Sequence, residues 1–159
     1  MRLFYHFGKY LVMLRSLFSR PERINMYWKE TLRQAHDIGV DSVIIVTIVA
    51  LFIGAVTAVQ TAYQLFGTTL VPYYYLGVIV RDTTILELAP TVTCLILAGK
   101  VGSNIASELG NMRISEQIDA LEIMGINSTA YLIGPKIVAA MVVIPMLIIL
   151  AAVLSITGG

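Results

Sequence analysis

The fold is decided by two adjoining stretches, ELAPTVTCLILAGK (residues 87–100) and VGSNIASELGNMRISEQIDALEIMG (residues 101–125). The first is an apolar run with one acid inside it, and the second is polar and rich in helix-forming residues. A second apolar run follows. Because charged side chains are costly inside a bilayer, a polar helix between two spans lies on one side of the membrane. There a soluble partner can push on it, which favours a transport subunit over a soluble enzyme.

The composition is that of an all-α membrane protein. Of the 159 residues, 57% are hydrophobic and only 13% are charged, whereas soluble domains carry roughly 25% charged residues. The net charge of +1 excludes the strongly basic surface typical of nucleic-acid binding. The single cysteine excludes a disulfide within one chain.

Residues 1–38 are predicted to form amphipathic helices at the membrane interface. In residues 3–18, apolar side chains recur on one face and basic side chains lie roughly opposite, a pattern typical of interfacial helices. The alternative is a helix packed on the spans. Residues 22–38 form a second amphipathic piece, in which Tyr27 and Trp28 are aromatic types favoured at membrane interfaces.

Three later segments are long and apolar enough to cross a bilayer, for which roughly 20 residues suffice. They run from about Val40 to Phe66, within Tyr73–Lys100, and from about Tyr131 to Ile156. Gly54 in the first segment predicts a close helix crossing, because small residues let backbones approach. The second segment is longer than one span needs, so we expect a break near residues 81–82.

The spans carry a few polar side chains. We expect Gln60 to face the protein interior, since polar groups avoid lipid. Arg81 and Asp82 are sequence neighbours on different helix faces and need not pair with each other. Glu87 either lines a polar part of a substrate cavity or pairs with Arg81. In the alternative interpretation it lies close enough to the outer interface to be hydrated.

Basic residues predict the orientation. Residues 1–33 are rich in Lys and Arg, whereas the turn at residues 67–72 has none. By the positive-inside rule, the N-terminus lies in the cytoplasm and this turn lies outside. The polar segment 101–128 therefore returns to the cytoplasm. It is longer than a plain connector of roughly 2–8 residues, which favours a docking element over a solvated loop.

Within that segment Ile114, Ile118 and Leu121 are expected to share a face, with the acids mostly directed away. No phosphate-binding loop exists, because Lys100 is followed by Val101 rather than by Ser or Thr. Neither a metal-ligand spacing nor a paired catalytic constellation is present. We therefore expect no enzyme, cofactor or metal here, and any ATP would be hydrolysed by a partner.

These residues resemble the MlaE family, the permease subunits of ABC transporters that move lipids between membranes in Gram-negative bacteria. The resemblance extends through nearly the whole chain and is densest after residue 86. It is carried by Phe7-Gly8-Lys9, Arg20-Pro21-Glu22, Gly39-Val40, Phe52-Ile53-Gly54, Glu87-Leu88-Ala89-Pro90, Ala98-Gly99-Lys100-Val101-Gly102-Ser103, Glu108-Leu109-Gly110, Met112-Arg113, Glu116-Gln117-Ile118-Asp119-Ala120-Leu121 and Met124-Gly125-Ile126-Asn127.

The resemblance implies a permease of the inner membrane that works as a homodimer and moves phospholipid or a related lipid between membranes. Its partners would be a cytoplasmic ABC ATPase, an MCE-domain protein that exchanges the lipid, and a second permease copy. The candidate lipid-cavity residues are Glu87, Gln60, Arg81 and Asp82. The candidate ATPase-coupling residues are Glu108, Arg113, Glu116, Gln117, Asp119, Leu121 and Glu122.

The chain also departs from the family pattern. Leu86 stands where some relatives carry a basic residue that would contact lipid phosphate, and Ser128 stands where relatives often have proline. Family members usually carry further spans after the third, so we expect residues 39–159 to be an incomplete permease region, truncated at the C-terminus. The alternative function is a small membrane scaffold without transport activity of its own.

Overall fold

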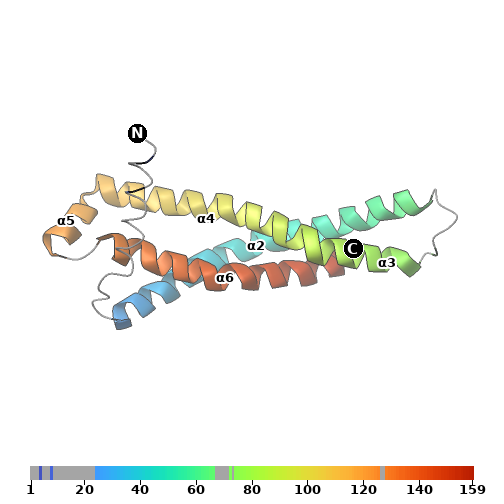
Figure 1. The fold of residues 1–159 in the computed structure, drawn as a ribbon, viewed down its shortest axis with the longest axis horizontal. Coiled ribbons are helices and arrows are strands. Elements are labelled where there is room, and N and C mark those ends of the chain that lie inside the picture. Colours follow the sequence, from blue (N-terminus) through green and yellow to red (C-terminus); the bar gives the residue numbers. More distant parts are fainter. Residues whose placement is uncertain (1–3, 5–7, 9–23, 67–71, 73, 126–127) are drawn as a thin grey trace. The chain divides into compact units, whose positions relative to one another are not determined.

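The computed structural model describes residues 4, 8, 24–66, 72, 74–125 and 128–159. Its elements are α2 (Ile24–Phe66), α3 (Tyr74–Thr83), the π-helix η1 (Thr84–Leu88), α4 (Ala89–Ile114), α5 (Gln117–Ile123) and α6 (Ser128–Gly158) (Figure 1). Three helical segments are long and apolar enough to cross a membrane: Tyr27–Leu65, Tyr74–Ile114 and Ala130–Gly158. The all-α class and the three predicted spans are confirmed. The amphipathic helix predicted over 3–18 lies outside the described residues, apart from Phe4 and Gly8.

The piece predicted over residues 22–38 is not a separate helix. It forms the first part of α2, which continues for 43 residues to Phe66. At 1.5 Å per residue such a helix is roughly 65 Å long, about twice the thickness of a bilayer's hydrocarbon core. The change from amphipathic to apolar composition therefore changes the helix's surroundings without interrupting its backbone.

The break expected near residues 81–82 is a π-turn rather than a stop. The backbone N–H of Ala89 donates to the carbonyl oxygen of Thr84, which is the five-residue step of a π-helix. Pro90 follows directly, and proline cannot donate a backbone hydrogen bond to the residue four positions earlier. The wider turn lets the helix continue past the proline, so α3, η1 and α4 form one candidate span.

The contacts divide the chain into two units: Met1–Asp37 with Ser103–Val142, and Ile38–Gly102 with Val143–Gly159. The second unit has a small core made of Val46, Ala50, Leu97, Leu147 and Ala151. Many large apolar side chains of its helices are exposed, among them Phe52, Leu95 and Ile149. An apolar surface of this extent is typical of contact with lipid or with further protein.

Within the second unit, α2 and α6 cross with their backbones in close contact. A Cβ atom added to Gly54 would overlap the backbone carbonyl of Ser155, and one added to Gly158 would lie 2.6 Å from the carbonyl oxygen of Leu51. Only glycine fits such an approach. The close crossing predicted at Gly54 is confirmed.

Candidate functional site

A buried cation joins three helices of the first unit. The Lys136 side chain on α6 is 3% exposed and forms an ion pair with the carboxylate of Glu108 on α4. Its Nζ also donates to Oε1 of Gln34 on α2, at 3.2 Å. The Gln34 amide in turn donates to Oε1 of Glu30, also at 3.2 Å. We call Gln34, Glu108 and Lys136 the three-helix clamp.

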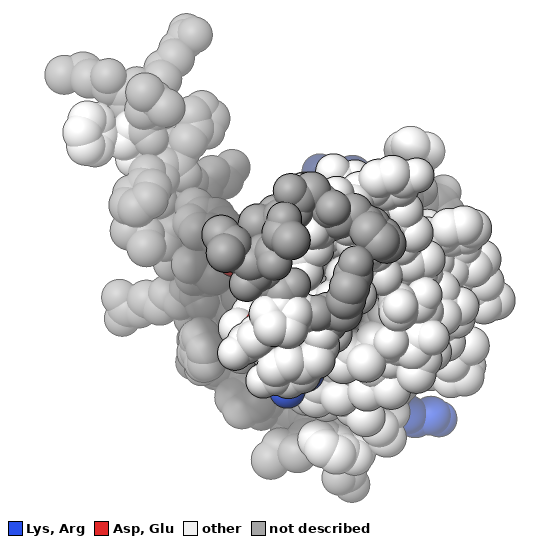
Figure 2. Space-filling view, turned by 90° about the vertical axis from the view of Figure 1, so that its right-hand side faces the viewer, with Lys and Arg blue, Asp and Glu red and all other residues white. Residues whose placement is uncertain are grey.

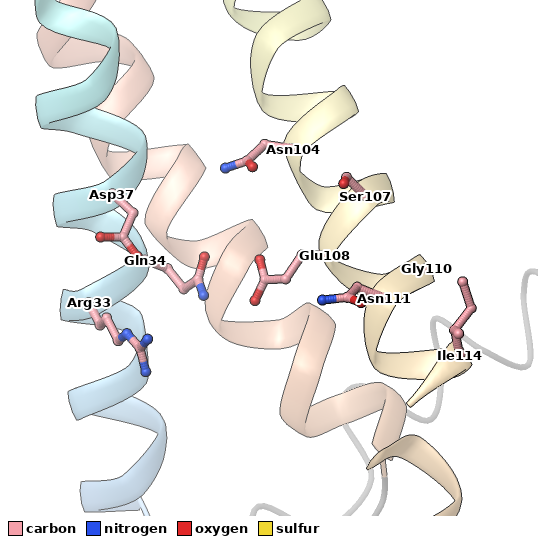
Figure 3. Close-up of a pocket in the computed structure, with 9 residues that line it drawn as sticks. All are labelled: Arg33, Gln34, Asp37, Asn104, Ser107, Glu108, Gly110, Asn111 and Ile114. Atoms are coloured by element: carbon pink, nitrogen blue, oxygen red, sulfur yellow. The ribbon is translucent and has the colours of Figure 1, made fainter. Parts of the chain in front are cut away.

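The clamp borders a polar pocket of about 710 Å³ between α2 and α4. Figure 3 shows Gln34 and Glu108 pointing toward each other across this space. Arg33 and Asp37 supply opposite charges on the α2 side. The lining residues are Arg33, Gln34, Asp37, Asn104, Ser107, Glu108, Gly110, Asn111 and Ile114.

The predicted coupling segment, residues 101–128, contains the end of one helix and a second, short helix. The polar stretch from residue 101 to Ile114 continues α4, and the chain then turns into the short helix α5. Glu116 makes that turn with a φ of 56°, in the left-handed region that non-glycine residues rarely adopt. Gly125, with a φ of 76°, follows the end of α5, where glycine in the left-handed region commonly terminates a helix.

Two polar contacts hold α5 to its neighbours. The Arg113 guanidinium of α4 forms an ion pair with Asp119 of α5, and the Ser128 hydroxyl of α6 donates to Glu122 at 3.0 Å. The exposed carboxylate of Glu116 forms no side-chain hydrogen bond or ion pair with any described residue. Four of the candidate coupling residues therefore have internal partners, since Glu108 is held by Lys136.

Under α5 lies an apolar pocket of about 300 Å³. Ile118 and Leu121 both line this pocket and therefore share a face, as predicted, but Ile114 is 85% exposed and does not share that face. The left-handed turn at Glu116 interrupts the helical register, so spacing counted across it does not hold. Ile123, which does not line the pocket, is exposed, and so is Met124 at its edge. The pocket is lined by Met112, Gln117, Ile118, Ala120, Leu121, Met124, Tyr131 and Leu132.

The candidate lipid-contacting residues all lie in the second unit and all are exposed. Gln60 was expected inside the protein and instead lies on the surface of this chain. Arg81 does pair with Asp82, through Nε and an Nη atom at 2.8 Å each. The long arginine side chain folds back along the helix, so adjacency does not prevent the contact. Glu87 is exposed on the π-turn.

Gln60 and Arg81 lie at similar distances from the ends of their helices. Gln60 lies six residues before the end of α2, and Arg81 lies seven residues after the start of α3, so each is roughly 10 Å from its helix end. Seen from the end where α3 begins, most of the described surface is uncharged (Figure 2). Exposed polar groups on such a surface need a cavity, a headgroup or a protein partner.

Sequence reasoning missed two members of the clamp, Gln34 and Lys136. The signal for Lys136 was present, because it is the only charged residue in the whole of α6. A single charged residue in a helix that is apolar enough to span a membrane is expected to face a partner in the protein. Gln34 carries no comparable signal in an amphipathic stretch.

Comparison with known families identifies the fold's relatives. A family model described as Permease MlaE matches residues 31–159. The chain belongs to the MlaE permease family. With three candidate spans, this membership makes it a multi-pass membrane protein.

Curated relatives in the MlaE family carry permease names. A probable ABC transporter permease protein of Rickettsia bellii is 34% identical over 99% of this chain and 60% of the relative. The intermembrane phospholipid transport system permease protein MlaE of Haemophilus influenzae is 32% identical over 93% of this chain and 56% of the relative. The chain thus spans little more than half the length of these relatives.

Plant chloroplasts contain a more distant member. The protein trigalactosyldiacylglycerol 1 of Arabidopsis thaliana is 31% identical over 77% of this chain and 34% of the relative.

Proposed function

We propose that this MlaE-family chain forms the transmembrane part of an ABC transporter permease that moves phospholipid or a related lipid. The proposal is carried by α5, which lies in sequence between two helices that are apolar enough to span a membrane. An ion pair between Arg113 and Asp119 joins α5 to α4, and a hydrogen bond from Ser128 to Glu122 joins it to α6. Because α5 is held on both sides, a displacement of α5 is passed on to α4 and α6. ATP hydrolysis belongs to a separate ATPase, and this subunit has no catalytic role of its own.

The proposed setting is supported by the distribution of basic residues and by the family. The chain lies in the inner membrane with its N-terminus in the cytoplasm, which places α5 on the ATPase side. A second permease copy completes the cavity, and an MCE-domain protein exchanges lipid on the other side. In unit 2, the exposed polar groups of Gln60, Arg81, Asp82 and Glu87 meet the lipid headgroup. The exposed apolar helix faces hold its acyl chains.

Charge reversal at Glu116 tests the docking of α5. Glu116→Lys is expected to lower the amount of ATPase that copurifies with the permease by about tenfold, as measured changes at electrostatic interfaces suggest. Glu116 suits this test because its carboxylate is exposed and has no side-chain partner among the described residues. Quantitative copurification from membranes measures the effect.

Asp119→Lys alone would be ambiguous, because it also breaks the ion pair with Arg113. Arg113→Gln breaks the same pair without reversing the charge of α5 and serves as its control. Glu116→Gln removes charge without reversing it and is expected to give an intermediate result. Undiminished copurification and lipid movement in Glu116→Lys would show that α5 is not the docking element.

Glu87→Gln tests the lipid-contacting role of the π-turn. The amide keeps the size of the side chain and removes its charge, so the complex is expected to assemble normally. Crosslinking of a photoactivatable phospholipid to the permease is expected to fall roughly fivefold, as after loss of one charge-assisted hydrogen bond. Unchanged crosslinking would remove Glu87 from the lipid path.

A further inference from the structure

The contacts of the first unit form a closed circuit through its four helices. Lys136 joins α6 to α4 through Glu108 and to α2 through Gln34. Tyr27 of α2 and Tyr131 of α6 add an edge-to-face ring contact, with centroids 6.1 Å apart. The pairs Arg113–Asp119 and Glu122–Ser128 complete the circuit through α5.

Lys136 is the one residue of this circuit that touches two other long helices through a single atom. Its ammonium group is buried, whereas the Glu108 carboxylate is 39% exposed and borders the polar pocket. A buried ammonium group needs its hydrogen-bond acceptors, because water cannot replace them there. Separating α6 from both α2 and α4 would therefore leave this charge without acceptors among the described residues, and separating α6 from α4 alone would leave only Gln34.

We infer that Lys136 is a positioning residue for transport: with Glu108 and Gln34 it makes α2, α4 and α6 move together when α5 is pushed. The inference rests on the proposed function, since it requires an ATPase that acts on α5. Without the clamp, a push on α5 would reach α4 and α6 only at the ends that contact α5. ATP hydrolysis would then continue while less lipid moved.

The ratio of lipid moved to ATP hydrolysed distinguishes this role from a merely structural one. The intact permease–ATPase complex is reconstituted in vesicles of phosphatidylethanolamine and phosphatidylglycerol that contain fluorescently labelled phosphatidylethanolamine. Lys136→Met is expected to assemble with the ATPase and to lower this ratio by about tenfold, within the range of coupling between distant sites. Lys136→Arg, which keeps the charge, is expected to retain most of the ratio.

Asp37→Asn is the matched control, because Asp37 lines the same pocket and belongs to no contact of the clamp. It is expected to leave the ratio unchanged. If Lys136→Met does not assemble, Gln34→Leu provides a second test, since it removes only the α2 contact. That variant is expected to lower the ratio by about threefold, in line with partial loss of coupling.

The outcomes separate the two proposals. A wild-type complex that hydrolyses ATP and moves no lipid would overturn the proposed function itself. A wild-type complex that moves lipid, alongside Lys136→Met or Gln34→Leu with an unchanged ratio, would overturn the role of the clamp alone. An equal loss in Lys136→Met and Asp37→Asn would assign the effect to the pocket and would also contradict the clamp.

Discussion

Gly54→Ala is expected to destabilise the chain by about 2 kcal/mol, a typical cost of overpacking a tightly packed site. The new methyl group would overlap the backbone carbonyl of Ser155 on α6. A backbone atom has no rotamer by which to move aside, so the two helices must separate. The loss of close packing then extends along their crossing, where Gly158 approaches Leu51 in the same way.

Gly99→Ala provides a control with the opposite expected sign. Gly99 lies inside α4, in the same unit, and a Cβ atom there meets no other atom within 4 Å. Alanine in a helix interior is more stable than glycine by roughly 0.5–1 kcal/mol. Thermal unfolding of the purified chain in detergent, followed by circular dichroism, measures both variants. Equal shifts of the melting temperature would contradict the close crossing.

The close crossing of α2 and α6 was predictable because the sequence feature that indicates it, a glycine in an apolar segment, is local. Glycine within an uncharged run is enough to indicate where helices approach closely. The three spans were predictable for the same reason, since each is mostly apolar over a sufficient length, although Arg81, Asp82 and Glu87 interrupt the second. Gly54 required no knowledge of its partner Ser155, which lies a hundred residues later.

Features that depend on backbone register were predicted less well. The left-handed residue Glu116 shifts the phase between α4 and α5, so Ile114 leaves the face shared by Ile118 and Leu121. Glutamate is not a residue type that signals a left-handed turn. In a similar way, the apparent break near Arg81 is absorbed by a π-turn, which has no clear sequence pattern of its own.

The clamp was missed because its contacts span long separations. Lys136 is 28 residues from Glu108 and 102 residues from Gln34, and hydrophobic periodicity carries no information about such pairs. Sequence reasoning placed Glu108 among the coupling residues but gave it no partner. Only the packing of α2, α4 and α6 shows that one cation meets both acceptors.

The clamp predicts that its two charged members differ in their importance for stability. Glu108→Gln is expected to destabilise the chain by about 3 kcal/mol, because removing one partner of a buried pair leaves the other charge uncompensated. The uncompensated group would be the Lys136 ammonium, which is 3% exposed and cannot be hydrated in place. Gln34 would remain as its acceptor from α2.

Lys136→Met is expected to cost less than about 1 kcal/mol, since methionine fills a similar volume and leaves no buried charge behind. The carboxylate left behind is 39% exposed and can bind water from the polar pocket. Thermal unfolding in detergent of both single variants and of the double variant measures the difference. In the double variant no buried charge remains, so its stability is expected to match that of Lys136→Met and to exceed that of Glu108→Gln. The reverse ranking would show that Glu108, and not Lys136, is the group that depends on its partner.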